Sequence, residues 1–95
     1  MNAKEKLYYL LKEFKEGRYD TSTFCDQFTI TYDIEVDYAE LSTIENKLFG
    51  ELSMITARYS PFEEDLKIPN VYYDEKKVRS EVEKVLNALI QNGKG

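Results

Sequence analysis

Apolar residues recur at helical spacing in four segments of this chain, and this pattern restricts the fold more than any other feature. Residues three and four positions apart lie on one face of an α-helix, so each stripe marks a helix with one buried face. The inward residues of the four stripes are Leu7, Leu10, Leu11 and Phe14; Phe24, Cys25, Phe28 and Tyr32; Ile44, Leu48, Leu52 and Ile55; and Val78, Val82, Val85, Leu86 and Leu89. A chain of 95 residues is one domain's worth. We therefore predict a single all-α domain over residues 1–95, arranged as a small antiparallel four-helix bundle.

Short polar residues precede each stripe, and such residues cap helix N-termini by accepting hydrogen bonds from free amide groups. The predicted caps are Asn2, Asp20 or Thr21, Ser42 within the capping box Ser42-Thr43-Ile44-Glu45, and Asp74. The predicted helix ends are Glu16 with Gly17 after it, about Tyr32, about Tyr59, and the pair Asn92-Gly93. Pro61 stops the third helix, and Pro69 is expected to keep the loop that follows extended.

Residues 29–38 do not fit the helical pattern. Apolar and polar residues alternate there without a fault, as is typical of a β-strand, with Ile30, Tyr32, Ile34, Val36 and Tyr38 on one side. A strand must pair, however, and the other candidate strand, residues 66–73, is interrupted by Pro69. We therefore expect the second helix to continue to about Tyr32, followed by an extended connector. A short two-stranded ribbon formed from residues 29–38 is the alternative.

Charge is unevenly distributed along the chain. The net charge is −5, but the stretch from Asp20 to Asp65 holds eleven acidic residues and only two bases, Lys47 and Arg58. A surface of this sign does not suit direct binding to nucleic acid, and it favours a cationic protein partner.

Several residue types that most enzymes use are missing. There is no histidine, the commonest general base and metal ligand, and no glycine-rich phosphate loop. We expect no enzyme activity and no cofactor. The single Cys25 cannot form an internal disulfide, and its apolar neighbours favour a buried, unreactive thiol. The longest uncharged stretch, residues 85–93, is too short to span a membrane, and Met1 leads into charged residues with no export signal. These features suit a cytoplasmic protein with no membrane partner.

Two groups of acidic residues are candidate sites. Asp33, Glu35 and Asp37 have the opening spacing of a calcium loop, but Tyr38 and Ile44 occupy positions where that loop needs glycine and glutamate. A solvated edge is therefore favoured over a metal site, and a metal-dependent carboxylate enzyme would require ions bound there.

The second group is the acidic triad, Glu63, Glu64 and Asp65, which follows Tyr59 and Phe62. The triad is either a solvated loop or an anionic projection for a cationic partner, with the two aromatic residues as anchors.

The second half of the chain resembles the bacterial self-protective colicin-like immunity family. The resemblance lies in residues 52–61 (LSMITARYSP), the acidic loop after them, and residues 73–82 (YDEKKVRSEV), and it is best over residues 41–90. The spacing from Phe24 to Arg58 also suits the family. In the type member, acids flank the proline on both sides; here Ser60 and Phe62 do, and the negative charge is displaced to the triad.

This resemblance implies a four-helix antiparallel bundle that binds the tRNA-cleaving domain of a cognate toxin one to one and covers its active site. Acidic side chains would then stand in for substrate phosphates. The toxin, of colicin or contact-dependent-inhibition type, would be contacted by Glu63, Glu64, Asp65, Tyr59, Phe62 and Ser60, with Asp33, Glu35 and Asp37 as a second acidic patch. The alternative function is a non-enzymatic helical adaptor or dimerisation module that docks a protein partner through residues 29–38.

Overall fold

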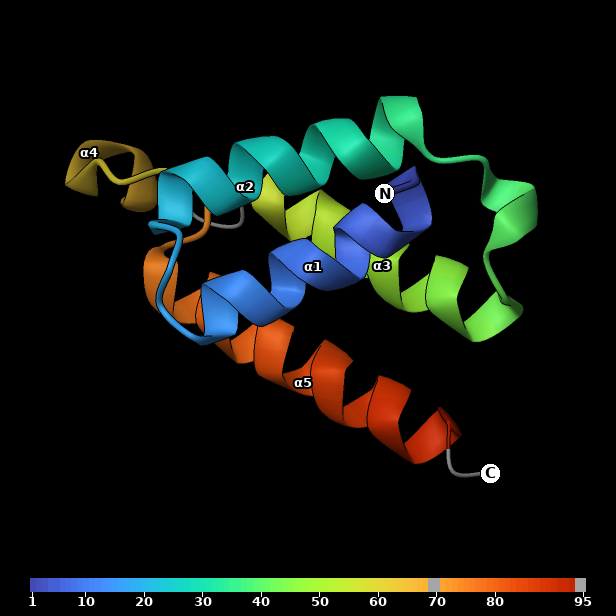
Figure 1. The fold of residues 1–95 in the computed structure, drawn as a ribbon. Coiled ribbons are helices and arrows are strands. Elements are labelled where there is room, and N and C mark those ends of the chain that lie inside the picture. The colour runs from blue at the N-terminus through green and yellow to red at the C-terminus, as the bar shows by residue number, and fades with distance from the viewer. Residues whose placement is uncertain (69–70, 94–95) are drawn as a thin grey trace.

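The computed structural model describes residues 1–68 and 71–93, and the described part is all-α, as predicted (Figure 1). The α-helices are α1 (Ala3–Lys15), α2 (Thr21–Ile30), α3 (Thr43–Thr56), α4 (Glu63–Leu66) and α5 (Glu75–Gly93). A π-helical turn, η1 (Thr31–Glu35), continues α2, and a 3₁₀ turn, η2 (Tyr38–Glu40), precedes α3. The described residues contain no β-strand, and no helix among them is long and apolar enough to cross a membrane. The extended chain expected around Pro69 falls outside the described residues.

The four long helices share one core. Figure 1 shows α1 lying between α2 and α5, and α3 contacts both α2 and α5. Most of the predicted inward residues are buried, and the half-buried ones, Tyr32, Ile44, Ile55, Leu86 and Leu89, pack at the margin of the core. The pattern missed Phe49, which is fully buried beside the α3 stripe and meets Phe28 edge to face with ring centroids 6.0 Å apart.

The predicted N-caps are all present. The side chains of Asn2, Asp20, Ser42 and Asp74 accept hydrogen bonds from the amides of Glu5, Thr23, Glu45 and Lys77. Gly17 follows α1 with a φ of 82°, the left-handed conformation that ends many helices. The predicted end of the third helix was wrong by three residues. The helix stops at Thr56 because the backbone at Arg58 and Ser60 pairs with Tyr73 instead of continuing the helix.

The sequence-based prediction for residues 29–38 was partly wrong. The chain stays helical to Glu35, beyond the expected end at Tyr32, so neither the ribbon nor an extended segment forms before Val36. The Val36 amide donates to the Thr31 carbonyl at 2.9 Å, a five-residue step that defines the π turn. Because η1 is a turn of helix, the alternating residues do not share a face: Val36 is buried, whereas Ile34 is exposed.

Gly50 allows α3 to approach the Tyr32 ring. The Tyr32 hydroxyl donates to the Asn46 side-chain oxygen, and a Cβ added at Gly50 would lie 3.0 Å from that hydroxyl. Glycine inside a helix costs about 1 kcal/mol relative to alanine. Here the missing side chain makes room for the tyrosine.

We predict that Gly50→Ala and Tyr32→Phe are strongly coupled. In the wild-type background, Gly50→Ala raises helix propensity, but its new methyl group crowds the Tyr32 hydroxyl. The free energy of unfolding therefore rises by much less than about 1 kcal/mol, or falls. In a Tyr32→Phe background, where the hydroxyl is gone, the same change adds about 1 kcal/mol. Urea unfolding of the four proteins of this cycle measures the coupling. Simple additivity would contradict the proposed contact.

Glu45 ties the start of α3 to α1. Its carboxylate accepts hydrogen bonds from the Ser42 amide (2.8 Å) and the Tyr8 hydroxyl, and it pairs with Lys4 Nζ at 3.2 Å. Burial acts to raise the pKa of Glu45, but these partners lower it, and the net pKa lies below the ordinary value. Burial and the nearby Glu45 charge raise the pKa of the Tyr8 hydroxyl. The folded state therefore favours the ionised form of the Glu45 carboxylate.

We predict that Glu45 makes stability depend on acid pH. Because folding lowers its pKa, its contribution is present above the unfolded-state pKa and is lost as pH falls through the folded-state value. Glu45→Gln should lower the free energy of unfolding at pH 7 by about 1–2 kcal/mol, and this difference should shrink below about pH 4. Urea unfolding across pH measures it. Glu51→Gln, an exposed position on the same helix, should show little change at any pH.

Candidate functional site

The chain leaves the helical core after Ser60 and returns to it at Tyr73. The Ser60 amide donates to the Tyr73 carbonyl at 3.0 Å, and the Tyr73 amide donates to the Arg58 carbonyl at 2.9 Å, which closes the base of the excursion. Its described part, residues 61–68 and 71–72, is here called the tip segment. Figure 1 shows it projecting from one end of the molecule with α4 at its extremity. The loop predicted for the acidic triad is thus partly helical, because Glu63, Glu64 and Asp65 form most of α4.

Ser60 fixes the tip segment to the core. Its side chain is only 4% exposed. The Ser60 hydroxyl donates to Asp65 Oδ2 at 2.7 Å and accepts from the Phe62 amide at 3.1 Å. Asp65 therefore serves the internal structure of the segment, and the orientation of α4 depends on this bond.

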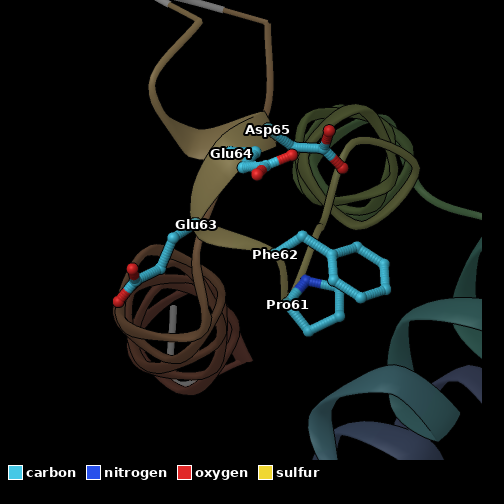
Figure 2. A pocket seen from close by; sticks show the side chains of 5 residues that line it. All are labelled: Pro61, Phe62, Glu63, Glu64 and Asp65. Carbon is cyan, nitrogen blue, oxygen red and sulfur yellow. The ribbon is translucent and has the colours of Figure 1, made fainter.

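The three carboxylates of the acidic triad do not form one cluster. Successive residues in a helix are rotated by about 100°. Figure 2 shows Glu63 directed away from Glu64 and Asp65, on the side of α4 opposite to the Phe62 ring. Together with Pro61 and Phe62 they line an open hollow of ≈ 640 Å³.

Glu63 and Glu64 are free to meet a partner. Both are exposed, and neither forms an ion pair with any residue in the described part of the chain. Phe62 beside them is 65% exposed, an unusual position for a large apolar ring. The tip thus combines net negative charge with an apolar side chain, a combination that suits a cationic surface with an apolar recess.

The remaining predicted contact residues are less accessible. Tyr59 is half-buried against the core, and Ser60 is buried. Two exposed apolar residues of the tip segment, Ile68 and Val71, were missed in the sequence analysis. Their signal in the sequence is weak because Pro69 interrupts the apolar pattern of residues 66–73.

The second acidic patch lies elsewhere. Asp33 Oδ1 accepts from the Ser53 hydroxyl at 2.8 Å, Glu35 pairs with Lys6 Nζ at 3.3 Å, and Asp37 accepts from the Ala39 amide at 3.0 Å. Each carboxylate therefore has its own partner. Figure 1 places η1 and the connector to α3 at the end of α2 away from α4, so the structure does not bring the two acidic groups together. Within residues 1–68 and 71–93, no group of three or more potential metal ligands comes together.

The negative charge of the middle of the chain is largely uncompensated. Of its eleven acidic residues, Glu35 and Glu45 are the two that form ion pairs with described residues. The other ion pairs join acids and bases of the flanks: Lys15 with Glu83, Arg18 with Glu13 and Glu16, Lys77 with Glu81, and Arg79 with Glu75. Lys15, Arg18, Lys77 and Arg79 thus pair within the flanks, and Lys4 and Lys6 are the two flanking bases that pair with acids of the middle stretch among the described residues.

Cys25 is buried, as predicted. Burial, with a smaller effect of the Asp26 charge, raises the pKa of its thiol to about 12. The thiol is therefore protonated at neutral pH and is a poor nucleophile.

No protein-family model, curated protein or solved structure matches this chain.

We predict that Ser60→Ala loosens the tip segment without unfolding the core. Loss of a buried hydrogen bond costs about 1 kcal/mol, which increases local opening by about fivefold. A glutamate-specific protease should then cleave after Glu63 and Glu64 about fivefold faster, while the thermal midpoint changes by a few degrees at most. Ser80→Ala on α5, where no hydrogen bond to the exposed side chain is present among the described residues, is the control. Equal cleavage of both variants would show that Ser60 does not hold α4.

Proposed function

We propose that this chain is an immunity protein, a non-catalytic inhibitor that binds a cognate bacterial nuclease toxin one to one in the cytoplasm of the producing cell. The toxin is of the colicin or contact-dependent-inhibition type, and its nuclease domain is a tRNase. One observation carries the proposal: an acidic tip projects from a helical core, and its Glu63 and Glu64, beside the exposed Phe62, form no ion pair with described residues. In this proposal the four long helices form the small antiparallel bundle of the colicin-like immunity family.

The chemistry of a nuclease explains why such a tip would inhibit it. A cleft that binds RNA is lined with cationic groups because its substrate is a polyanion. Carboxylates on a folded projection can occupy the positions of substrate phosphates. The polypeptide contains no phosphodiester bond for the nuclease to cleave. Because Glu63 and Glu64 diverge, they can meet two separate cationic groups, and the Phe62 ring can be buried in an apolar recess on the Glu64 side.

Opposite charge also accelerates capture. An acidic inhibitor is steered toward a basic toxin, and association is fastest at low salt. Speed matters here because free toxin cleaves RNA until it is bound. We place the toxin contact at the tip segment, with Ser60 and Asp65 holding it in position and Tyr59 supporting its base. Asp33, Glu35 and Asp37 lie outside this contact.

We predict that Glu63→Gln/Glu64→Gln weakens binding to the cognate toxin by at least about tenfold and flattens its salt dependence, with no change in fold. The assay requires the cognate toxin, to be sought in a neighbouring open reading frame that ends in a basic nuclease-like domain. Binding kinetics measured from about 50 to 500 mM salt test the effect. Growth rescue during co-expression provides the cellular readout.

The matched control is Glu81→Gln/Glu83→Gln on α5. It removes the same number of negative charges, but from acids that pair with Lys77 and Lys15. It should leave toxin affinity nearly unchanged. If both double variants weaken binding equally, the net charge of the chain is responsible and the tip is not the contact. If the wild-type chain neither binds the toxin nor rescues growth, the immunity function itself is wrong.

A further inference from the structure

A line of side-chain hydrogen bonds joins α2–η1 to α3. The hydroxyls of Thr29 and Thr56 are 2.7 Å apart, and the Ser53 hydroxyl donates to Asp33 Oδ1 at 2.8 Å. As residue numbers rise along α2–η1, they fall along α3. The two segments therefore run in opposite directions along this seam.

The residues on either side of the seam differ in burial. Phe28 and Leu52, which each precede a seam residue, are fully buried in the core. The residues that follow are exposed: Ile30 by 44%, Ile34 by 78% and Met54 by 64%. One step along a helix rotates the side chain by about 100°, and in two oppositely directed neighbours this rotation is toward the same side. Ile30, Ile34 and Met54 therefore lie on one outer face, which is here called the α2–α3 face.

The α2 side of this face is acidic. No lysine or arginine occurs between Arg18 and Lys47, so α2 and η1 contain acidic but no basic residues. Asp26 lies one helical turn before Ile30, and it forms no ion pair with a described residue. Asp33 borders Ile34, and its carboxylate is bound by a neutral hydroxyl, which leaves its charge uncompensated. Exposed apolar side chains bordered on the α2 side by acids that form no ion pair with described residues suit a partner that is both apolar and cationic.

We propose that the α2–α3 face docks a cationic amphipathic helix of a protein partner, whose apolar residues cover Ile34 and Met54 and whose lysines or arginines approach Asp26 and Asp33. Residues 29–35 are themselves helical, so the partner adds no strand to this segment and packs helix against helix. A second copy of this chain is a poorer occupant, because two chains that each carry a net charge of −5 repel one another. The proposal goes beyond the toxin contact, since η1 follows α2 at the end away from α4 (Figure 1).

A synthetic helix of this chemistry tests the proposal with the full chain. The probe is a peptide of about 18 residues with leucines at helical spacing and lysines elsewhere. Titration by fluorescence anisotropy gives the affinity, and methyl NMR locates the contact. We expect shifts of the Ile30, Ile34 and Met54 methyl signals. Ile34→Ser and Met54→Ser should each weaken binding by about tenfold, the effect of losing one buried apolar contact. Asp26→Asn should weaken it less and reduce its salt dependence.

Ile90→Ser is the matched control, because Ile90 is 54% exposed on α5. It should leave peptide affinity unchanged, and the substituted side chains are exposed enough that the thermal midpoints should stay close together. Absence of peptide binding, an equal loss in Ile90→Ser, or methyl and amide shifts confined to the tip segment would each overturn the proposal. Self-association of the free chain that Ile34→Ser abolishes would assign the face to a second copy and would also overturn it. None of these results depends on whether the toxin binds the tip.

Discussion

Contacts among four phenylalanines position everything else in this molecule. Phe14 of α1 stacks on Phe24 of α2 at 4.3 Å between ring centroids, Phe24 packs on Phe28, and Phe28 meets Phe49 of α3. Arg79 of α5 covers the Phe14 ring at 4.6 Å. Each buried aromatic ring removes roughly 150–250 Å² from water, so this chain of rings supplies a large share of the hydrophobic stabilisation of a small domain. It sets α2 against α1 and α3, and thereby fixes both the polar seam and the point where the tip segment leaves the core.

The sequence predicts the features that are decided locally. Amphipathic stripes mark the long helices because their period is a property of each helix alone, and capping residues mark where they begin because the cap bonds to an amide three residues away. The errors occur where tertiary contacts decide. Phe49 was missed because it lies beside the apolar stripe, and α3 ends early because distant Tyr73 pairs with the backbone after it. Alternation over residues 29–38 is a strand signal that loses to the continuation of α2, since no partner strand competes for the backbone.

The candidate site shows the same division. Charge counting identified the acidic triad, and composition identified Phe62 as a potential anchor. The direction of each carboxylate could not be predicted, because it depends on the helical turn of α4 and on the bond from Ser60 to Asp65. Separation of the two acidic patches likewise depends on the path of the chain through the core. Residues that look alike in the sequence thus have different tasks: Asp65 and Asp33 accept hydrogen bonds from serines that hold the structure, whereas Glu63 and Glu64 are left for solvent or a partner.

The pairing of Ser60 and Arg58 with Tyr73 has a consequence for how such a protein can diversify. The two ends of the tip segment are held together by backbone hydrogen bonds, which any residue except proline can form. Between those ends, insertions and replacements disturb few core contacts, and doubling the length of a flexible loop adds only about 0.6 kcal/mol of closure entropy. The tip segment can therefore change in sequence and length while the helical core stays the same. New recognition chemistry can be installed there without redesigning the helices that carry it.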